Sequence, residues 1–515
     1  MATLICDFMS DSYLESIAEN LCTLRPKQFS HLLAHRRPDK NKKIDELIFL
    51  DATQLYRHEN LSKCFKDLAI APIELTYSDK LAECQILFMA AFDRTAPEPN
   101  STHYVQHLFW DLVGYYISFF RNNINVDSVL FDNTPHLPWD ICLFFVAKML
   151  DKKVLFLRKT GMCGYLYIDE DFRPNKGAWK SEYTGLLNPL KTIVEKEDFF
   201  SDLNDLSFSK GQVDGMWPKK LEVKKDFLLK IKDSLRSFGL GKLVSFIGVL
   251  LKSPLNNHIL ATQSSSQRTV LAGMVFVSRW RFVKLHFDHI KALKAKVLLY
   301  SALSSKSIDL SKPYVYFALH LQPERTTLPE GLIYDDQVIA IRTLSEALPI
   351  GWKIFVKEHP RQMKYDIRST HGRSCLDYER LSAIDNVLIA PLDFSHEKLV
   401  ASCKCTSTIS GSVSWEGLLL GKPSLVFSEN WHADCDVTYV VASVKDAKDA
   451  FLDLANMSAN SIKLSTCRFV LHSHKYLINS ALNGNHLRVF FDEKTASVAL
   501  NNISSGILQR LAKKI

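Results

Sequence analysis

The chain has 515 residues, of which 47% are hydrophobic and 23% are charged, and its formal net charge is +8. This length exceeds what one hydrophobic core supports, so at least two domains are expected, and the composition excludes a disordered chain. No apolar run is long enough to span a bilayer, and residues 1–10 lack the features of a secretory signal. The net charge suits an anionic ligand or a membrane surface but is equally explained by solubility. The basic residues are not interleaved with aromatic ones, so no nucleic-acid partner is predicted.

The eleven cysteines are scattered along the chain. This distribution is typical of reduced thiols and predicts a cytoplasmic protein. Cys403, Cys405, His432 and Cys435 could be imagined as metal ligands, but their spacing matches no common zinc site. We therefore predict no metal and no cofactor.

Residues 1–210 predict an N-terminal Rossmann-like domain. Short apolar runs alternate with longer amphipathic segments, which is typical of strands and helices in a parallel sheet. Strands are expected at Glu46–Leu50, Gln85–Ala90, Ser128–Phe131 and Lys153–Leu157, and helices at Tyr104–Phe120 and Trp139–Leu150.

Residues 211–305 predict a helical connecting region. Apolar residues recur at helical spacing between Phe227 and Phe238, Leu243–Leu251 is nearly all apolar, and Arg279–Leu303 is a further helix candidate. Two interpretations stay open: a helical insertion packed between domains, or a basic amphipathic face that contacts the anionic inner membrane. The basic residues of this region include Lys219, Lys220, Lys224, Lys225, Lys230, Lys232 and Arg236.

Residues 306–483 form the clearest α/β unit, because their short strand–helix steps describe a doubly wound Rossmann-like domain. Residues 484–515 predict a helical tail that contains a helix at Ile503–Lys514. In the α/β unit, strands are expected at Tyr314–Leu319, Trp352–Lys357, Asn386–Ala390, Cys405–Ile409 and Ser424–Phe427, and helices at Asp335–Leu348, Ser395–Ser402 and Val413–Leu420.

Polar residues follow two of these strands. Lys357-Glu358-His359-Pro360 follows one, and Ser410-Gly411-Ser412 follows another and opens a helix. Ligands of open α/β sheets bind outside the carboxyl ends of the strands, so these segments are expected to line one crevice. The N–H groups and hydroxyls of the second segment suit a phosphate, to which His359 can donate a hydrogen bond. Glu416, one turn into the helix, can accept two hydrogen bonds from a ribose diol.

Each of these residues has a structural alternative. His359 could be a buried structural histidine, Ser410 and Ser412 could be a helix cap, and Glu416 could face solvent near the helix dipole. His320, Gln322 and Glu324 are further candidates, because they also follow a predicted strand.

Five blocks follow one another between Tyr314 and Trp431: Leu319–Glu324, Lys357–Pro360, Thr408–Ser412, Trp415-Glu416 with Gly421-Lys422-Pro423, and Asn430-Trp431-His432. In the order and spacing of these blocks, the segment resembles the capsule polysaccharide biosynthesis family of bacterial glycosyltransferases. That family is related to the Kdo transferases of capsule assembly and more distantly to bacterial sialyltransferases. The N-terminal half is similar to it more loosely, through Asp93-Arg94 and Phe131–His136, and Trp415 is bulkier than the residue usual in the family.

The resemblance implies a GT-B fold, in which two Rossmann-like domains face a cleft. It also implies a glycosyltransferase that moves an acidic, Kdo- or sialic-acid-like sugar from a CMP-activated donor to a growing bacterial surface polysaccharide. The acceptor would be an oligosaccharide or a lipid-linked glycan. The phosphate-binding motifs of the relatives map onto His359, Ser410 and Ser412, and His320, Gln322 and Glu324 would then lie on the side of the donor sugar.

An inverting transferase also needs a base for the acceptor hydroxyl. Asp93, Asp132 and His136 are the candidates in the N-terminal domain, although His136 could instead cap a helix and Asp93 could pair with Arg94. Asp169-Glu170-Asp171 contains the Asp-x-Asp pattern that binds metal in another transferase fold. Its position in a turn predicts a solvated acidic loop instead.

Two other functions stay open. An enzyme of the same fold could use a UDP- or GDP-sugar as a transferase or an epimerase, with Lys357, Arg361 and Lys422 available for a second phosphate. A protein of a different class would be a non-catalytic component of polysaccharide assembly or export.

Overall fold

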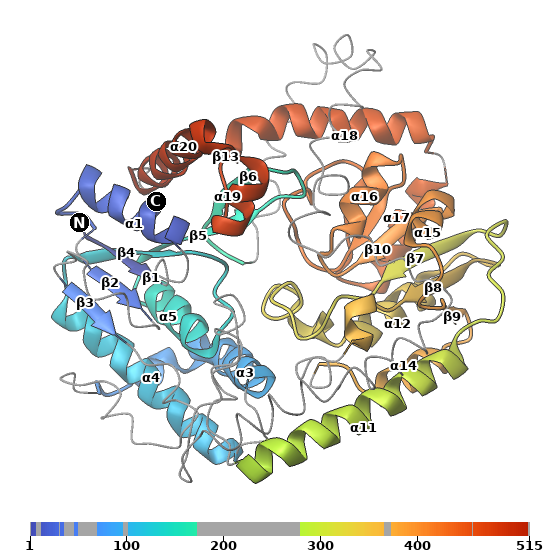
Figure 1. Cartoon of the computed structure of the whole chain (residues 1–515), viewed down its shortest axis with the longest axis horizontal. Coiled ribbons are helices and arrows are strands. Elements are labelled where there is room, and N and C mark those ends of the chain that lie inside the picture. Colours follow the sequence, from blue (N-terminus) through green and yellow to red (C-terminus); the bar gives the residue numbers. More distant parts are fainter. Residues whose placement is uncertain are drawn as a thin grey trace, which may run out of the picture. The chain divides into compact units, whose positions relative to one another are not determined.

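The computed structural model describes residues 2–6, 12–29, 31–34, 46–49, 70–95, 101–172, 279–364, 372–455 and 457–512. The described residues form two compact units, one from residues 2–172 and 477–512 and the other from 279–476 (Figure 1). Each unit contains one sheet with helices packed on it. The basic stretch from Lys219 to Arg236 and the run Leu243–Leu251 lie outside the described residues.

The first unit has a seven-stranded sheet in the order β13-β6-β5-β4-β1-β2-β3. Strands β1 to β5 are parallel, whereas β6 and β13 are antiparallel to their neighbours. The strand order therefore reverses between β1 and β4. The bounds are β1 (Ala2–Cys6), β2 (His31–Ala34), β3 (Glu46–Phe49), β4 (Val126–Phe131), β5 (Lys153–Lys159), β6 (Tyr165–Asp169) and β13 (Ile478–Asn479).

The prediction of a strand at Gln85–Ala90 is wrong, because this segment lies inside helix α3 (Ser78–Thr95). Leu81, Phe88 and Phe92 are buried at helical spacing, while Ile86 between them is 70% exposed. A short apolar run fits a buried helix as well as a strand. The other helices of residues 12–172 are α1 (Ser12–Leu24), the 3-10 helix η2 (Leu75–Tyr77), α4 (Thr102–Asn122) and α5 (Pro138–Met149).

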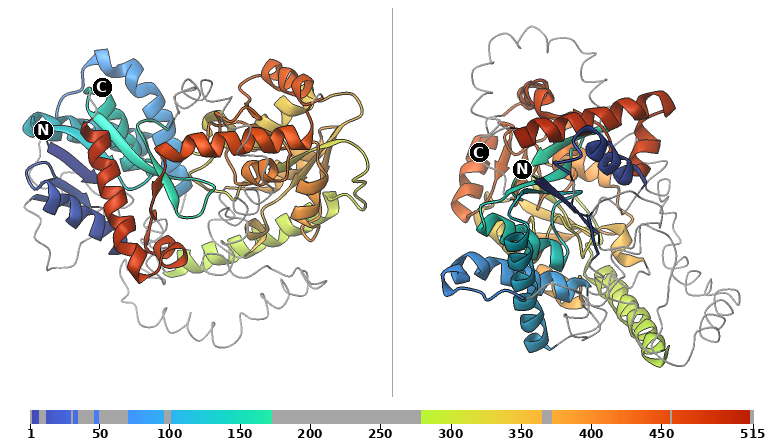
Figure 2. Two further views of the ribbon diagram at one scale, coloured as in Figure 1. Left: turned by 90° about the horizontal axis from the view of Figure 1, so that it is seen from above. Right: turned by 90° about the vertical axis from the view of Figure 1, so that its left-hand side faces the viewer.

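After residue 476 the chain returns to the first unit. There β13 pairs with β6, and helices α19 (Gly484–Phe490) and α20 (Glu493–Ala512) follow. Ile503 and Ile507 of α20 share a core with Ile5 and Leu14, and Figure 2 shows α20 close to α1. The predicted C-terminal helix is thus part of a longer helix that completes the core of the first unit.

The second unit has a six-stranded sheet in the order β12-β11-β10-β7-β8-β9, and all its strands are parallel. Numbered along the chain, this is the 3-2-1-4-5-6 order of a Rossmann-like sheet, with the reversal between β7 and β10. All five strands predicted here are confirmed within one or two residues. The bounds are β7 (Tyr314–Ala318), β8 (Lys353–Lys357), β9 (Val387–Ile389), β10 (Cys405–Thr408), β11 (Ser424–Val426) and β12 (Thr438–Val440).

Both faces of this sheet are buried, as expected for parallel strands. Val315 and Phe317 face one core and Tyr314 and Tyr316 face the other, because successive side chains of a strand alternate. The helices are α11 (Arg279–Leu303), η6 (Leu332–Asp335), α12 (Gln337–Ala347), η7 (Pro360–Met363), α14 (Cys375–Ser382), α15 (His396–Ser402), α16 (Val413–Leu419), α17 (Val444–Leu454), α18 (Ala459–Ser473) and η8 (His474–Tyr476).

The predicted fold class, an α/β chain with two Rossmann-like units, is confirmed by these two sheets. The expected helix at Arg279–Leu303 is α11, with the same bounds. Among the helices that the structure describes, none is long and apolar enough to cross a membrane.

Candidate functional site

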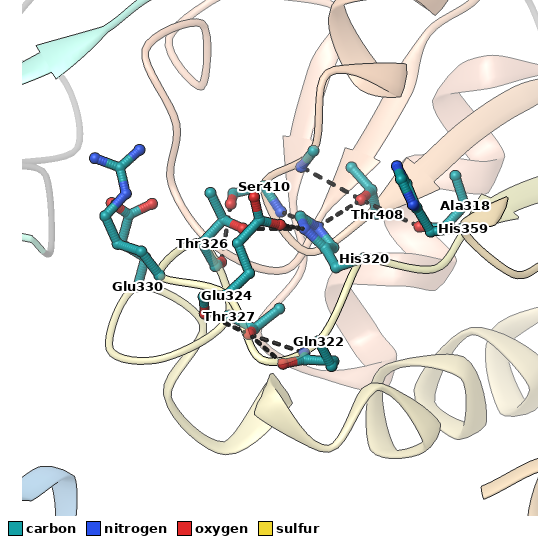
Figure 3. Close-up of polar contacts among 12 residues, drawn as sticks. Ala318, His320, Gln322, Glu324, Thr326, Thr327, Glu330, His359, Thr408 and Ser410 are labelled. Atoms are coloured by element: carbon teal, nitrogen blue, oxygen red, sulfur yellow. Dashed lines mark hydrogen bonds and ion pairs between the residues drawn. The ribbon is translucent and has the colours of Figure 1, made fainter. Parts of the chain in front are cut away.

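The carboxyl ends of β7, β8 and β10 bring polar residues to one edge of the second sheet. His320, His359 and Ser410 each stand two residues beyond the end of one of these parallel strands. Strands β7 and β10 flank the reversal of strand order, where open α/β sheets usually bind their ligands. His320, His359, Thr408 and Ser410 lie together at this edge (Figure 3).

His320 holds the turn that contains Ser410. Its Nε2 atom lies 2.9 Å from Thr408 Oγ1 and accepts the backbone N–H of Ser410 at 3.2 Å. An N–H group can only donate, so the proton of the neutral ring is on Nδ1, which lies 3.1 Å from Thr326 Oγ1. A Cβ atom on Gly411 would come within 3.2 Å of the ring and 2.8 Å of Thr408 Oγ1. The buried His320 ring is therefore in close contact with the Ser410-Gly411-Ser412 turn and leaves no room for a larger residue at position 411.

The Ser410-Gly411-Ser412 turn leaves backbone donors unused. Ser410 Oγ donates to the carbonyl of Thr326 at 3.0 Å, and the N–H of Gly411 donates to Thr408 at 3.3 Å. The next two N–H groups, of Ser412 and Val413, have no hydrogen-bond partner among the described residues. Adjacent unpaired N–H groups in a turn form a concavity that suits an anion.

The surroundings of His359 make it a neutral hydrogen-bond donor. Its Nδ1 atom accepts the N–H of Arg361 at 3.2 Å, so the proton of the neutral ring is on Nε2. Burial, reinforced by the charges of Arg361 and Lys357, lowers the pKa of His359 to about 4 against the opposing effect of Glu324. Near pH 7 the ring is therefore neutral, and Nε2 is the atom that can donate.

Lys357, the last residue of β8, is only 6% exposed. Its ammonium group makes no hydrogen bond or ion pair with any residue that the structure describes. Burial lowers the pKa of Lys357, while the carboxylates of Glu358, Glu397 and Asp393 raise it. No direct hydrogen bond or ion pair neutralises this largely buried ammonium group, so an anionic ligand is a natural complement to it.

Glu358 supports the site from within the unit. It is 1% exposed, and its Oε2 atom lies 3.1 Å from Arg373 Nε and accepts the Tyr378 hydroxyl at 2.6 Å. Its Oε1 atom accepts the N–H of His359 at 2.7 Å, and Arg373 also donates to the carbonyl of His320 at 3.1 Å. The Glu358–Arg373 pair thus connects the two segments that carry the histidines.

Glu416, on the first turns of α16, is held by two donors. Ser412 Oγ donates to its Oε1 atom at 2.9 Å, and its Oε2 atom lies 2.8 Å from His396 Nε2. Burial alone would raise the pKa of Glu416, but the hydrogen bond and charge of His396, with the Ser412 bond, hold that pKa below its ordinary value. His396 is not among the residues that the sequence suggests.

The other two candidates of this unit, Gln322 and Glu324, and the bulky Trp415 have different surroundings. Gln322 is buried and bonds Thr327 Oγ1 at 2.8 Å within its own loop, whereas Glu324 is exposed, with Oε2 3.5 Å from His320 Nδ1. Trp415 is buried, and its ring centroid lies 4.6 Å from that of Trp431. The indole therefore faces the interior of the unit.

In the first unit, Asp132 and His136 follow β4, one of the two strands that flank the reversal of order in that sheet. His136 Nδ1 donates to the carbonyl of Thr134 at 2.8 Å, so in the neutral ring the lone pair is on Nε2. Arg94 of α3 donates to the His136 carbonyl. Asp93 is exposed and lies within α3. It therefore does not follow a strand, although the sequence predicts that it does.

The residues considered as metal ligands have other partners. Asp169 pairs with the buried Arg158 at 3.1 Å, so the acidic turn is not wholly solvated. His432 bonds Ser414 Oγ at 3.0 Å and Thr438 Oγ1 at 3.2 Å. Within the described ranges, no group of three or more acidic, histidine or cysteine side chains could hold a metal ion.

No protein-family model matches the chain, and no curated protein matches it either. Solved structures similar to it include the UDP-GlcNAc 2-epimerase of Neisseria meningitidis bound to UDP-GlcNAc, at 12% identity, full coverage of both chains and a TM-score of 0.23. The spinosyn rhamnosyltransferase SpnG is similar at 11% identity over 91% of this chain and 96% of its own, with a TM-score of 0.23. KpsC of Thermosulfurimonas dismutans, a β-Kdo 2,4 transferase, is similar at 13% identity over 63% of this chain and 79% of its own, with a TM-score of 0.25. Since identities and TM-scores are this low, the function has to be inferred from the site itself.

Proposed function

We propose that the chain is a GT-B glycosyltransferase that transfers an acidic, Kdo- or sialic-acid-like sugar from a CMP-activated donor to a growing bacterial surface polysaccharide. The observation that carries the proposal is a set of donors at one edge of the second sheet. They are the backbone N–H groups of Ser412 and Val413, the Nε2–H of His359 and the ammonium of Lys357. These groups suit one phosphate beside the reversal of strand order.

The chemistry needs such donors because negative charge develops on the leaving phosphate as the sugar–oxygen bond breaks. Donors that are already oriented stabilise that charge without reorganisation. The Glu416 carboxylate, one turn further into α16, is the proposed acceptor for the ribose hydroxyls. A CMP leaving group presents one phosphate and one ribose, which corresponds to these two parts of the edge.

The acceptor hydroxyl would be deprotonated by a residue of the first unit. His136 is the first candidate, because the Thr134 carbonyl fixes its proton on Nδ1 and places the lone pair on Nε2. Asp132 follows the same strand, and Asp93 precedes Arg94, which binds the loop of His136. The acceptor would be an oligosaccharide or a lipid-linked glycan in the cytoplasm.

A thermal-shift panel with CMP, CDP, UMP, UDP and GDP tests the nucleotide, followed by transfer assays with CMP-Kdo and CMP-sialic acid. A ligand at about 100 times its Kd stabilises the folded state by roughly 2.7 kcal/mol, which is readily measured. Stabilisation by CMP, with transfer from a CMP-sugar, is the expected result. A preference for UDP or GDP would instead indicate a diphosphate-sugar transferase or epimerase, and no stabilisation by any nucleotide would favour a non-catalytic component of polysaccharide assembly.

A further inference from the structure

A chain of hydrogen bonds leads from the interior of the second unit to Glu416. The Tyr316 hydroxyl lies 2.9 Å from His396 Nδ1, and His396 Nε2 lies 2.8 Å from Glu416 Oε2. Tyr316 belongs to β7, His396 begins α15, and Glu416 belongs to α16. Three separate elements thus fix the position of one carboxylate.

The direction of each bond follows from what the groups can donate. A carboxylate only accepts, so Ser412 O–H donates to Oε1 and His396 Nε2–H donates to Oε2. When the ring is neutral, its proton is on Nε2, and Nδ1 then accepts the hydroxyl hydrogen of Tyr316. Tyr316 is 1% exposed, and this bond satisfies a hydroxyl that would otherwise be buried next to an apolar core.

The two donors leave each carboxylate oxygen with a further lone pair. A ribose presents two neighbouring hydroxyls, so both oxygens must be in the right plane at once for a two-point contact. A glutamate side chain has several rotatable bonds, and a carboxylate held by Ser412 alone could turn about its last bond. His396 removes that freedom, because it holds the second oxygen.

We propose that His396, itself held by Tyr316, is a positioning residue that orients the Glu416 carboxylate for a two-point contact with a ribose and so sets a preference for ribonucleotides over deoxyribonucleotides. The inference rests on the proposed function, because it takes Glu416 as the ribose contact.

The alternative is a simple ion pair at the protein surface. The side chains of His396 and Glu416 are 36% and 26% exposed, and pairs with such exposure usually contribute little to stability. A simple ion pair would not alter the discrimination between two nucleotides that differ by one hydroxyl. That ratio therefore separates the two interpretations.

The test measures Kd values for CMP and 2′-deoxy-CMP by calorimetry. Wild type is expected to favour CMP about tenfold or more, as for a hydrogen bond to a charged acceptor. His396→Ala should bring the ratio close to one, and Glu416→Ala, which removes both acceptor oxygens, should do the same. His396→Gln should recover part of the preference, because its amide can still donate to Oε2, and Tyr316→Phe should give an intermediate ratio.

The outcomes are distinguishable. If wild type binds UDP or GDP instead of CMP, the same ratio is measured with that nucleotide and its 2′-deoxy form. In that case only the proposal of a CMP-activated donor is contradicted, and the positioning role can still be tested. If no nucleotide binds, the proposed function and this inference both fail. If wild type binds ribo and deoxy forms equally, or if folded His396→Ala keeps the wild-type ratio, the positioning role is overturned while nucleotide binding stands. Melting curves check that each variant folds. If His396→Ala does not fold, the ratios of Tyr316→Phe and His396→Gln test the positioning role instead.

Discussion

At the scale of single residues, backbone groups decide what each histidine can do. The N–H of Ser410 makes Nε2 of His320 an acceptor, whereas the N–H of Arg361 makes Nε2 of His359 a donor. The carbonyl of Thr134 gives His136 the same arrangement as His320, with a lone pair on Nε2. Three histidines that look alike in the sequence are therefore a support, a proposed phosphate donor and a proposed base.

Replacing His359 with alanine is expected to slow sugar transfer by roughly a hundredfold or more, because one donor to the developing phosphate charge is lost. His359→Gln should retain more activity, since its amide can still donate. Turnover is measured with a CMP-sugar, and melting curves check the fold. His474→Ala, at an exposed histidine of η8, is the control. Turnover near the wild-type level in His359→Ala would show that this histidine is structural.

Alanine variants of Asp93, Asp132 and His136 test the base. The variant that lacks the true base should lose sugar transfer. It should still bind CMP with unchanged affinity, because the nucleotide is proposed to bind the other unit. Calorimetry with CMP and a transfer assay on the same samples give the two measurements. If all three variants remain active, the acceptor side has been assigned to the wrong residues.

His396 could have been identified by the criterion that selected the other residues. It stands on the first turn of the helix after a predicted strand, just as Glu416 does. By contrast, no pattern marks Arg373, because its partners Glu358 and the His320 carbonyl come from distant parts of the chain. Such a contact follows from the topology of the sheet and not from local sequence.

At the scale of elements, the end of an apolar run is predictable where a stop residue follows it. Strand β8 ends before His359-Pro360 and α12 ends before Pro349, as these residues predict. No such stop follows the run at Gln85–Ala90, and the strand predicted there is wrong. The helical spacing of Leu81, Phe88 and Phe92 was the available signal, and it extends beyond the run itself.

The Glu358–Arg373 pair is expected to hold β7, β8 and α14 together. Arg373→Met leaves a buried carboxylate without its cation and should destabilise the protein by about 3–5 kcal/mol. In the background of Glu358→Gln, the same change should be much less harmful. Lys445→Met, in the exposed Lys445–Asp449 pair, is the matched control and should change stability little. Urea unfolding of the four variants measures this, and equal effects of Arg373→Met in both backgrounds would contradict a coupled pair.

At the scale of the whole molecule, stability should fall as the solution becomes more acidic than about pH 6.5. Burial lowers the pKa of His432 to about 3 and that of His359 to about 4. Between those values and the ordinary pKa, the unfolded chain binds protons that the folded chain does not. Each such histidine therefore lowers the free energy of unfolding by up to about 1.4 kcal/mol per pH unit on acidification.

Urea unfolding at pH 7 and pH 5 tests this dependence. His432→Gln, which cannot titrate, should show a smaller difference between the two pH values than wild type. The same substitution at the exposed His474 serves as the control. An unchanged difference in His432→Gln would mean that other groups cause the acid sensitivity.

Peripheral membrane contact is a further expectation, and it concerns basic residues outside the described ranges. Lysines near an anionic leaflet contribute on the order of 1 kcal/mol each, so the cluster from Lys219 to Arg236 should give reversible binding. Liposome sedimentation should require anionic lipid and weaken with salt. Binding that persists after the lysines are replaced, or no binding at all, would favour packing between the domains.

During synthesis, the unit that is made first is completed last. Ile5 and Leu14 leave the ribosome early, yet they pack against Ile503 and Ile507, nearly 500 residues later. At roughly 5–20 residues per second, these early residues wait on the order of half a minute or more for their partners. The described residues of the second unit all lie between 279 and 476, before the returning segment. Its core can therefore close while the first unit is still incomplete, with apolar residues of α1 open to chaperones.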